Sequence, residues 1–95
     1  MNNIKVNFLG GLEHLFGSVN ELSVNASDYH ILSDLIKDLA VNHIKQSPDL
    51  FNDDGFLAPG ILALINDCDI FTLDAENSPI TSGDTVTFIS TIHGG

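Results

Sequence analysis

One segment of the chain, residues 31–44, has the apolar period of an amphipathic helix. Its apolar stripe is formed by Ile31, Leu32, Leu35, Ile36, Leu39, Ala40 and Ile44. The opposite face is polar and carries Ser33, Asp34, Lys37, Asp38, Asn42 and Lys45. We expect this helix to begin after a cap at Ser27 or Asp28 and to end before Pro48. Because a single helix can bury its stripe only against another element, the chain must also supply a sheet.

Short segments of alternating or continuous apolar residues predict the strands of that sheet. Residues 4–9 (IKVNFL) alternate, and alternation resumes over residues 20–25 after two glycine breaks, which predicts an N-terminal hairpin. Residues 61–65 (ILALI) and 85–92 (TVTFISTI) predict two further strands. A short edge strand is expected between them, at Ile70, Phe71 and Leu73.

The order of these elements indicates one α+β domain. Residues 46–60 are rich in proline, glycine and aspartate and predict a long loop, held by apolar contacts from Leu50, Phe51 and Phe56. The economical architecture is a β-grasp fold, a mixed sheet of four to five strands with the main helix packed on one face. We expect a single domain over residues 1–95 with a flexible C-terminal tail at about residues 92–95.

The charge of the chain limits its partners. Thirteen acidic and three basic side chains give a formal net charge of -10, which repels phosphate backbones and argues against direct nucleic-acid binding. A single cysteine fits a reducing compartment, and neither a secretory leader nor a membrane-spanning stretch is indicated. We therefore expect a monomer that binds a partner with a basic face. Its expected location is the cytoplasm, with a nuclear pool as an open alternative.

The side chains offer little catalytic or metal-binding chemistry. The histidines His14, His30, His43 and His93 are spaced too irregularly for a local zinc site, and surface or rim positions are expected. Two aspartate pairs resemble parts of calcium loops without the remaining ligands, and they are better explained as turn residues: Asp53 and Asp54, and Asp67 and Asp69. No phosphate loop or serine elbow occurs. The acidic neighbours of Cys68 argue against a nucleophilic thiolate, so a small structural role is expected there.

The chain ends in an unusual way, with the strand-like stretch TFISTIHGG running to the last residue. Glycine has no Cβ, so Gly94 and Gly95 could pass through a narrow channel and present the terminal carboxylate to an enzyme. The alternative is a frayed, solvated terminus, which is the commoner meaning of two terminal glycines alone.

Longer motifs favour the first alternative. The runs PGILALINDCDIFTLD and GDTVTFISTIHGG, together with FLGGLEHLFG near the N-terminus, resemble the ubiquitin-related modifier family. The resemblance covers essentially the whole chain. It implies a protein that is not itself an enzyme and binds no cofactor. An activating enzyme with adenylation and rhodanese-type sulfur-transfer functions would use ATP and a persulfide sulfur source to convert the Gly95 carboxylate to a thiocarboxylate.

The resemblance also implies two uses of the activated terminus. The thiocarboxylate would supply sulfur for 2-thiolation of the wobble uridine of cytosolic tRNAs, through a separate tRNA thiolase complex. The terminus would also be conjugated to lysines of target proteins through an isopeptide bond. Gly95 is the activated residue in this reading. His93 and Gly94 would occupy the channel of the activating enzyme, and Ile92 would anchor the tail near its mouth.

A partner-docking patch is the last site that the sequence suggests. Alternation in the final strand puts Ile89 on the face opposite Phe88, and we expect Ile89 to form a patch with Ala63 or Ile65. A half-buried Ile89 without a binding role is an equal alternative. Two other functions also remain open at this point: a small sulfur-carrier subunit of molybdopterin or thiamine biosynthesis, and a noncovalent ubiquitin-like adaptor.

Overall fold

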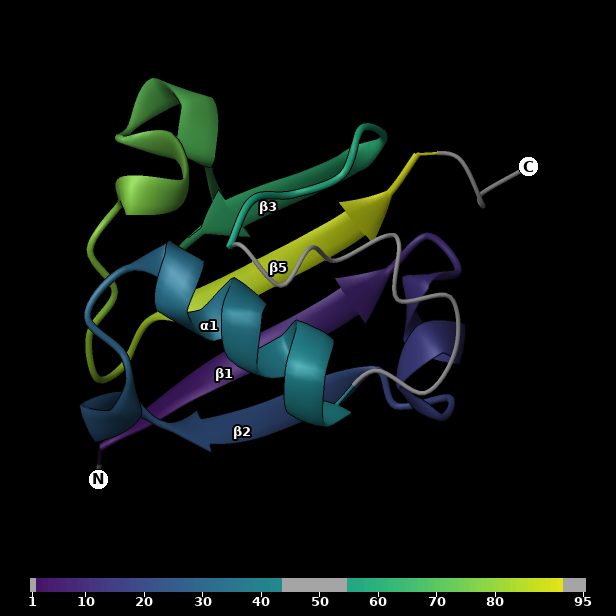
Figure 1. Ribbon diagram of the computed structural model, residues 1–95, viewed down its shortest axis with the longest axis horizontal. Coiled ribbons are helices and arrows are strands. Elements are labelled where there is room, and N and C mark those ends of the chain that lie inside the picture. The colour runs from purple at the N-terminus through teal and green to yellow at the C-terminus, as the bar shows by residue number, and fades with distance from the viewer. Residues whose placement is uncertain (1, 44–54, 92–95) are drawn as a thin grey trace.

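The structure is a computed structural model that describes residues 2–43 and 55–91, with Leu15 and His43 described by their backbone alone (Figure 1). Its strands are β1 (Asn3–Leu9), β2 (Glu21–Asn25), β3 (Ile61–Ile65), β4 (Cys68–Asp69) and β5 (Thr85–Ser90). Its helical segments are η1 (Leu12–Phe16), η2 (Ala26–Asp28), α1 (Leu32–Asp38), η3 (Leu39–His43), η5 (Ile70–Thr72) and η6 (Ala75–Asn77). The predicted order of strands around one main helix is confirmed.

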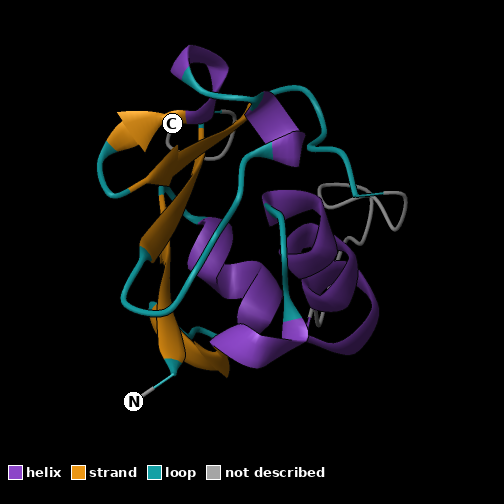
Figure 2. Cartoon of the chain, turned by 90° about the vertical axis from the view of Figure 1, so that its left-hand side faces the viewer, coloured by secondary structure: helices purple, strands orange, loops and turns teal. Residues whose placement is uncertain are grey.

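The strands form one mixed sheet in the order β2-β1-β5-β3-β4. The first and last strands, β1 and β5, are parallel neighbours at its centre, and the other pairs are antiparallel. Figure 2 shows the sheet along one side of the molecule and most helical segments on the other. Only one face of the sheet is therefore covered by α1, as the single apolar stripe predicted.

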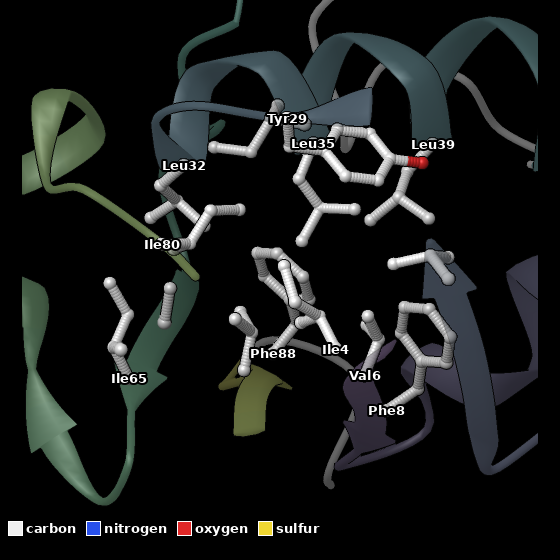
Figure 3. Close-up of a cluster of buried hydrophobic side chains, with 14 of the residues drawn as sticks. Ile4, Val6, Phe8, Tyr29, Leu32, Leu35, Leu39, Ile65, Ile80 and Phe88 are labelled. Carbon is white, nitrogen blue, oxygen red and sulfur yellow. The ribbon is translucent and has the colours of Figure 1, made fainter. Parts of the chain in front are cut away.

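The core lies between α1 and the covered face of the sheet. Leu32, Leu35, Ile36 and Leu39 are fully buried, which confirms the apolar stripe of the helix. They pack toward side chains that alternate along the central strands, among them Ile4, Val6, Phe8 and Phe88 (Figure 3). The Phe8 ring stacks on the Phe16 ring at a centroid distance of 4.0 Å.

The helix begins later than predicted. Ser27 and Asp28 belong to η2, and α1 starts at Leu32. The cap is the carboxylate of Asp34, which accepts hydrogen bonds from the backbone N–H groups of His30 and Ile31 at 2.9 and 3.1 Å. These two bonds hold the pKa of Asp34 below its ordinary value. The Asp34 carboxylate thus bonds back to the two residues that precede the first turn, as the third helical residue of a capping box does, and it fixes where the helix begins.

One side chain of the helix also differs from prediction. Ser33, expected on the polar face, is buried because the backbone of Gly55 packs against it. Gly55 has a φ of 89° and leaves no room for a Cβ beside the Ser33 hydroxyl. Beyond Asp38 the chain continues as the π-helical segment η3 as far as His43, and Ile44 lies outside the described residues.

The connections explain the remaining differences. Phe56, predicted to hold the long loop, is 54% exposed, whereas Leu57 packs partly against the core. Leu50 and Phe51 lie outside the described residues. The edge strand is β4, earlier than predicted, because Asn66 and Asp67 adopt φ values of 52° and 69° and close a two-residue hairpin. Ile70 is then buried in η5, while Phe71 and Leu73 are exposed.

Tyr29 links the start of the helical layer to the end of α1. Its side chain is buried, and its hydroxyl donates a short hydrogen bond to the Asp38 carboxylate. Burial, and then the bond and the negative charge of Asp38, raise the pKa of Tyr29 well above its ordinary value of 10.0. The neutral phenol is therefore strongly favoured in the folded chain.

This raised pKa predicts an alkaline loss of stability. Unfolded Tyr29 ionises near its ordinary pKa, whereas folded Tyr29 stays neutral there. The contribution of Tyr29 to the free energy of unfolding is therefore complete below pH ~10 and is lost as the pH rises toward the folded-state pKa. Tyr29→Phe should lower the free energy of unfolding by about 1–2 kcal/mol at neutral pH and flatten its alkaline decline. Because the chain has one tyrosine, tyrosinate absorbance measures the ionisation directly. A rise near pH 10 with the fold intact would contradict this account.

Candidate functional site at the carboxyl end of β5

The last described residues, Ser90 and Thr91, are fixed firmly to the fold and are called the tail root here. The backbone N–H and the hydroxyl of Thr91 both donate to the carbonyl oxygen of Gly60, at 2.8 and 2.9 Å. Ser90 is buried. The chain is thus held in a defined direction as far as Thr91, at the end of β5 (Figure 1).

A second glycine supports the tail root from the other side. Gly10 follows β1 and has a φ of 71°, which L side chains rarely adopt. A Cβ at this position would collide with the carbonyl oxygen of Ser90 and lie 3.2 Å from its amide nitrogen. The loop after β1 can therefore pack its bare backbone against the end of β5 only because residue 10 is glycine.

The predicted tail residues Ile92, His93, Gly94 and Gly95 lie outside the described residues. They follow the tail root directly in the sequence, and four extended residues span at most about 14 Å. The predicted channel, anchoring and activation roles of these residues therefore stay predictions. The structure shows that the residue before them, Thr91, is held in place by its hydrogen bonds to Gly60.

The docking patch predicted around Ile89 has different members from those expected. Ala63 and Ile65 are buried, because the register pairs them with Phe88 and Val86 on the core face of the sheet. Alternation then puts Ile89 on the opposite, uncovered face. Ile89 is half-buried, which fits both alternatives, so its docking role stays a prediction. The prediction for its two partners is wrong.

Two leucines take the place of those partners. Leu62 on β3 and Leu9 on β1 are both direct register neighbours of Ile89. Leu9 is 48% exposed and Leu62 is 39% exposed. Leu9, Ile89 and Leu62 therefore form an apolar row across three strands, next to the tail root. Alternation within IKVNFL would have placed Leu9 outward, but only the register brings the three side chains together.

Other candidate chemistry is sparse in the described part of the chain. His14 and His30 are exposed, as predicted, whereas the side chain of His43 and all of His93 lie outside the description. No group of three potential metal ligands occurs within residues 2–43 and 55–91. Cys68 is exposed on β4 instead of filling a structural position. Asp67 and Asp69 are turn residues, as predicted. Among the described segments, no helix is long and apolar enough to cross a membrane.

Comparison with known families identifies the chain. The profile of the family described as Urm1 (Ubiquitin related modifier) matches residues 3–95. The chain belongs to the ubiquitin-related modifier family. A ubiquitin-related modifier 1 homolog from Chlamydomonas reinhardtii is 39% identical over 99 residues, which cover 100% of each chain. The ubiquitin-related modifier 1 of Schizosaccharomyces pombe is 42% identical over 95 residues, covering 97% of this chain and 98% of the relative.

Solved structures agree with this family and with the fold. The solution structure of Urm1 from Trypanosoma brucei superposes with a TM-score of 0.83 at 39% identity, covering 99% of this chain and 96% of that one. The predicted β-grasp fold and family resemblance are both confirmed. A member of the ubiquitin-related modifier family is a ubiquitin-like modifier, which is consistent with a carrier protein rather than an enzyme.

Proposed function

We propose that this chain is a ubiquitin-like sulfur carrier whose terminal Gly95 is adenylated and then thiocarboxylated by an activating enzyme. The main support is the tail root: the chain is fixed as far as Thr91, and Ile92, His93, Gly94 and Gly95 follow it directly in the sequence. Family membership supports the same chemistry. The reactive group is a main-chain carboxylate, so the scarcity of catalytic side chains is expected.

The chemistry explains why a separate enzyme is needed. A terminal carboxylate has a pKa of about 3.5, is ionised at neutral pH and is a poor electrophile. Adenylation joins it to AMP with release of pyrophosphate from ATP and so creates a good leaving group. A persulfide of the activating enzyme then attacks the acyl carbon and AMP leaves. Reduction of the resulting acyl disulfide by an enzyme thiol releases the thiocarboxylate.

The proposed destination of the sulfur is the wobble uridine of cytosolic tRNAs, through a tRNA thiolase. The net charge of -10 supports this division of labour, because an acidic carrier leaves the tRNA to its partner. The same activated terminus would be conjugated to lysines of target proteins. We propose a monomeric, cytoplasmic carrier that holds no cofactor of its own, with ATP and the persulfide supplied at the activating enzyme.

Intact-mass measurement tests the proposal directly. The chain is incubated with ATP, the activating enzyme of the same organism and a persulfide source, and its C-terminal peptide is sequenced. Exchange of one oxygen for one sulfur at Gly95 is expected. An unchanged mass with an activating enzyme that loads its other substrates would instead favour a noncovalent adaptor. Loss of molybdoenzyme activity in place of tRNA thiolation, on deletion of the gene, would favour a cofactor-synthesis subunit.

The apolar row of Leu9, Ile89 and Leu62 is the proposed docking surface for the activating enzyme. It adjoins the tail root, so a partner that covers it also receives the tail. Ile89→Asp places a charge at the middle of the row and should raise the KM for loading by at least about tenfold. It should also lower the free energy of unfolding, because Ile89 is half-buried on an interior strand, so its loading is compared at a temperature where the variant is folded. Lys5→Asp is the matched control, since Lys5 is exposed farther along the same face. An Ile89→Asp chain that is loaded normally would remove the row from the docking surface.

A further inference from the structure

A second exposed apolar site lies at the far end of the molecule, in residues 69–73, called the Phe71 turn here. Phe71 is 68% exposed and Leu73 is 47% exposed, although both are large apolar side chains. Neither side chain belongs to the apolar row of Leu9, Ile89 and Leu62. A pair of exposed apolar side chains at one turn is a typical element of a protein-binding surface.

The Phe71 turn is held rigidly by its own hydrogen bonds. The carboxylate of Asp69 accepts from the Phe71 N–H at 2.9 Å, and the Thr72 hydroxyl donates to the Asp69 carbonyl at 2.6 Å. The Leu73 N–H donates to the carbonyl of Ile70, whose side chain is fully buried. Phe71 and Leu73 are thus presented by an ordered turn anchored in the core, which lowers the entropy lost when a partner binds them.

The surroundings of the turn are acidic throughout. Residues 66–83 contain four carboxylates and neither lysine, arginine nor histidine. Asp67, Asp69 and Asp74 are exposed, whereas Glu76 accepts a hydrogen bond from the Leu57 N–H at 3.2 Å. An apolar anchor with an acidic rim is complementary to an apolar pocket rimmed by lysine and arginine.

The Phe71 turn and the tail root lie at opposite ends of the same two strands. The register pairs Ile61 with Ser90 at the tail end and Ile65 with Val86 at the other, where the hairpin leads into β4 and η5. Figure 1 shows the two sites at opposite ends of the sheet. A partner can therefore contact the Phe71 turn without occupying the surface around the tail root.

We propose that the Phe71 turn is a docking site for the sulfur-accepting, tRNA-binding enzyme. This inference rests on the proposed function. An enzyme that holds tRNA needs a lysine- and arginine-rich surface, and the acidic rim of the turn fits such a surface. Because the turn is remote from the tail root, it can distinguish the enzyme that receives sulfur from the enzyme that loads it. The anchor is Phe71, and Leu73 is the second exposed apolar side chain of the turn.

Transfer kinetics with the thiolase test this assignment. Thiocarboxylated chain is prepared by intein cleavage with sulfide, so that the experiment does not depend on the loading step. The rate of tRNA thiolation by the thiolase of the same organism is measured against carrier concentration. Phe71→Ser should raise the KM at least about tenfold with kcat unchanged, because docking is lost and the reacting group is intact. Val41→Ser is the matched control, since Val41 is 69% exposed on η3.

Charge and loading provide two further readouts. The double change Asp67→Asn with Asp74→Asn should raise the KM less than Phe71→Ser and weaken its salt dependence, and it leaves the capping Asp69 in place. Loading of Phe71→Ser by the activating enzyme should match that of the wild-type chain. Circular dichroism should give the same melting temperature for the wild-type chain and for each variant at an exposed position.

Three results would overturn the assignment. One is equal KM values for Phe71→Ser and Val41→Ser in the thiolase reaction. Another is a defect of Phe71→Ser confined to loading, which would give the turn to the activating enzyme. The third is a wild-type chain that loads normally but neither binds the thiolase nor transfers sulfur to it. Failure of the proposed function is recognised separately, as a wild-type chain that the activating enzyme does not load.

Discussion

Removal of Gly95 is expected to abolish sulfur loading completely while leaving the free energy of unfolding unchanged. The activating enzyme must reach a carboxylate at a fixed distance from the surface on which it docks the carrier. A chain that ends at Gly94 still has a terminal carboxylate, but its reach from Thr91 is shorter by about 3.5 Å. Misplacement of this size is enough to prevent reaction. The core lies elsewhere, between α1 and the sheet.

The measurement combines intact mass with thermal unfolding. The shortened chain should show no oxygen-to-sulfur exchange and no support of tRNA thiolation, at an unchanged melting temperature. A chain with one residue added after Gly95 is the opposing control, and it should fail for the same reason. If the shortened chain were loaded at the wild-type rate, the position of the carboxylate would not matter, and the proposed reaction at Gly95 would be wrong.

The fold was largely predictable from local patterns because each pattern reports one buried face. Alternation in residues 4–9 and the helical stripe from Leu32 to Leu39 both identify side chains that meet in the core. Two such faces leave few arrangements for a single sheet and helix. The parallel pairing of β1 with β5 was not visible in the sequence, since it joins segments about eighty residues apart.

The errors have local physical causes. Ser27 and Asp28 predict an earlier helix start because both are good capping residues, whereas Asp34 fixes the observed start by accepting from the N–H groups of His30 and Ile31. The edge strand begins earlier than its apolar residues predict because two non-glycine residues, Asn66 and Asp67, adopt positive φ and tighten the hairpin. Residue propensities alone do not predict which side chain will bond to the backbone or which non-glycine residue will adopt positive φ, because both depend on tertiary contacts.

The chemistry of the candidate site stays a prediction, and its surface was only partly predictable. The tail was assigned from its residues, which lie outside the described part of the chain. Ile89 was placed on the correct face by alternation, yet its neighbours depend on register, which a single strand does not encode. Gly10 gave no signal beyond a turn, although its bare backbone supports Ser90. A long-range contact of a glycine with a backbone carbonyl leaves no pattern in the sequence.

Gly10→Ala is expected to destabilise the chain and to impair loading together. The change adds one Cβ, which collides with the carbonyl oxygen of Ser90. Residue 10 also has a φ of 71°, which a residue with a Cβ rarely adopts. The left-handed conformation alone costs about 1–2 kcal/mol for a residue with a Cβ. The collision adds to that cost because the neighbour is backbone and cannot turn away. We expect a total loss of about 3 kcal/mol, within the range of backbone strain combined with overpacking.

Gly83→Ala separates the two contributions. Gly83 has a φ of 91°, but a Cβ there would meet nothing within 4 Å. Gly83→Ala should therefore lower the free energy of unfolding by the conformational cost alone, about 1–2 kcal/mol, and should be loaded like the wild-type chain. Gly10→Ala should in addition raise the KM for loading, because Ser90 and Thr91 must move and with them the starting point of the tail. Denaturant unfolding and loading kinetics on both variants measure these effects. Equal losses of stability, with equal loading, would mean that the tail root does not depend on the close approach of Gly10.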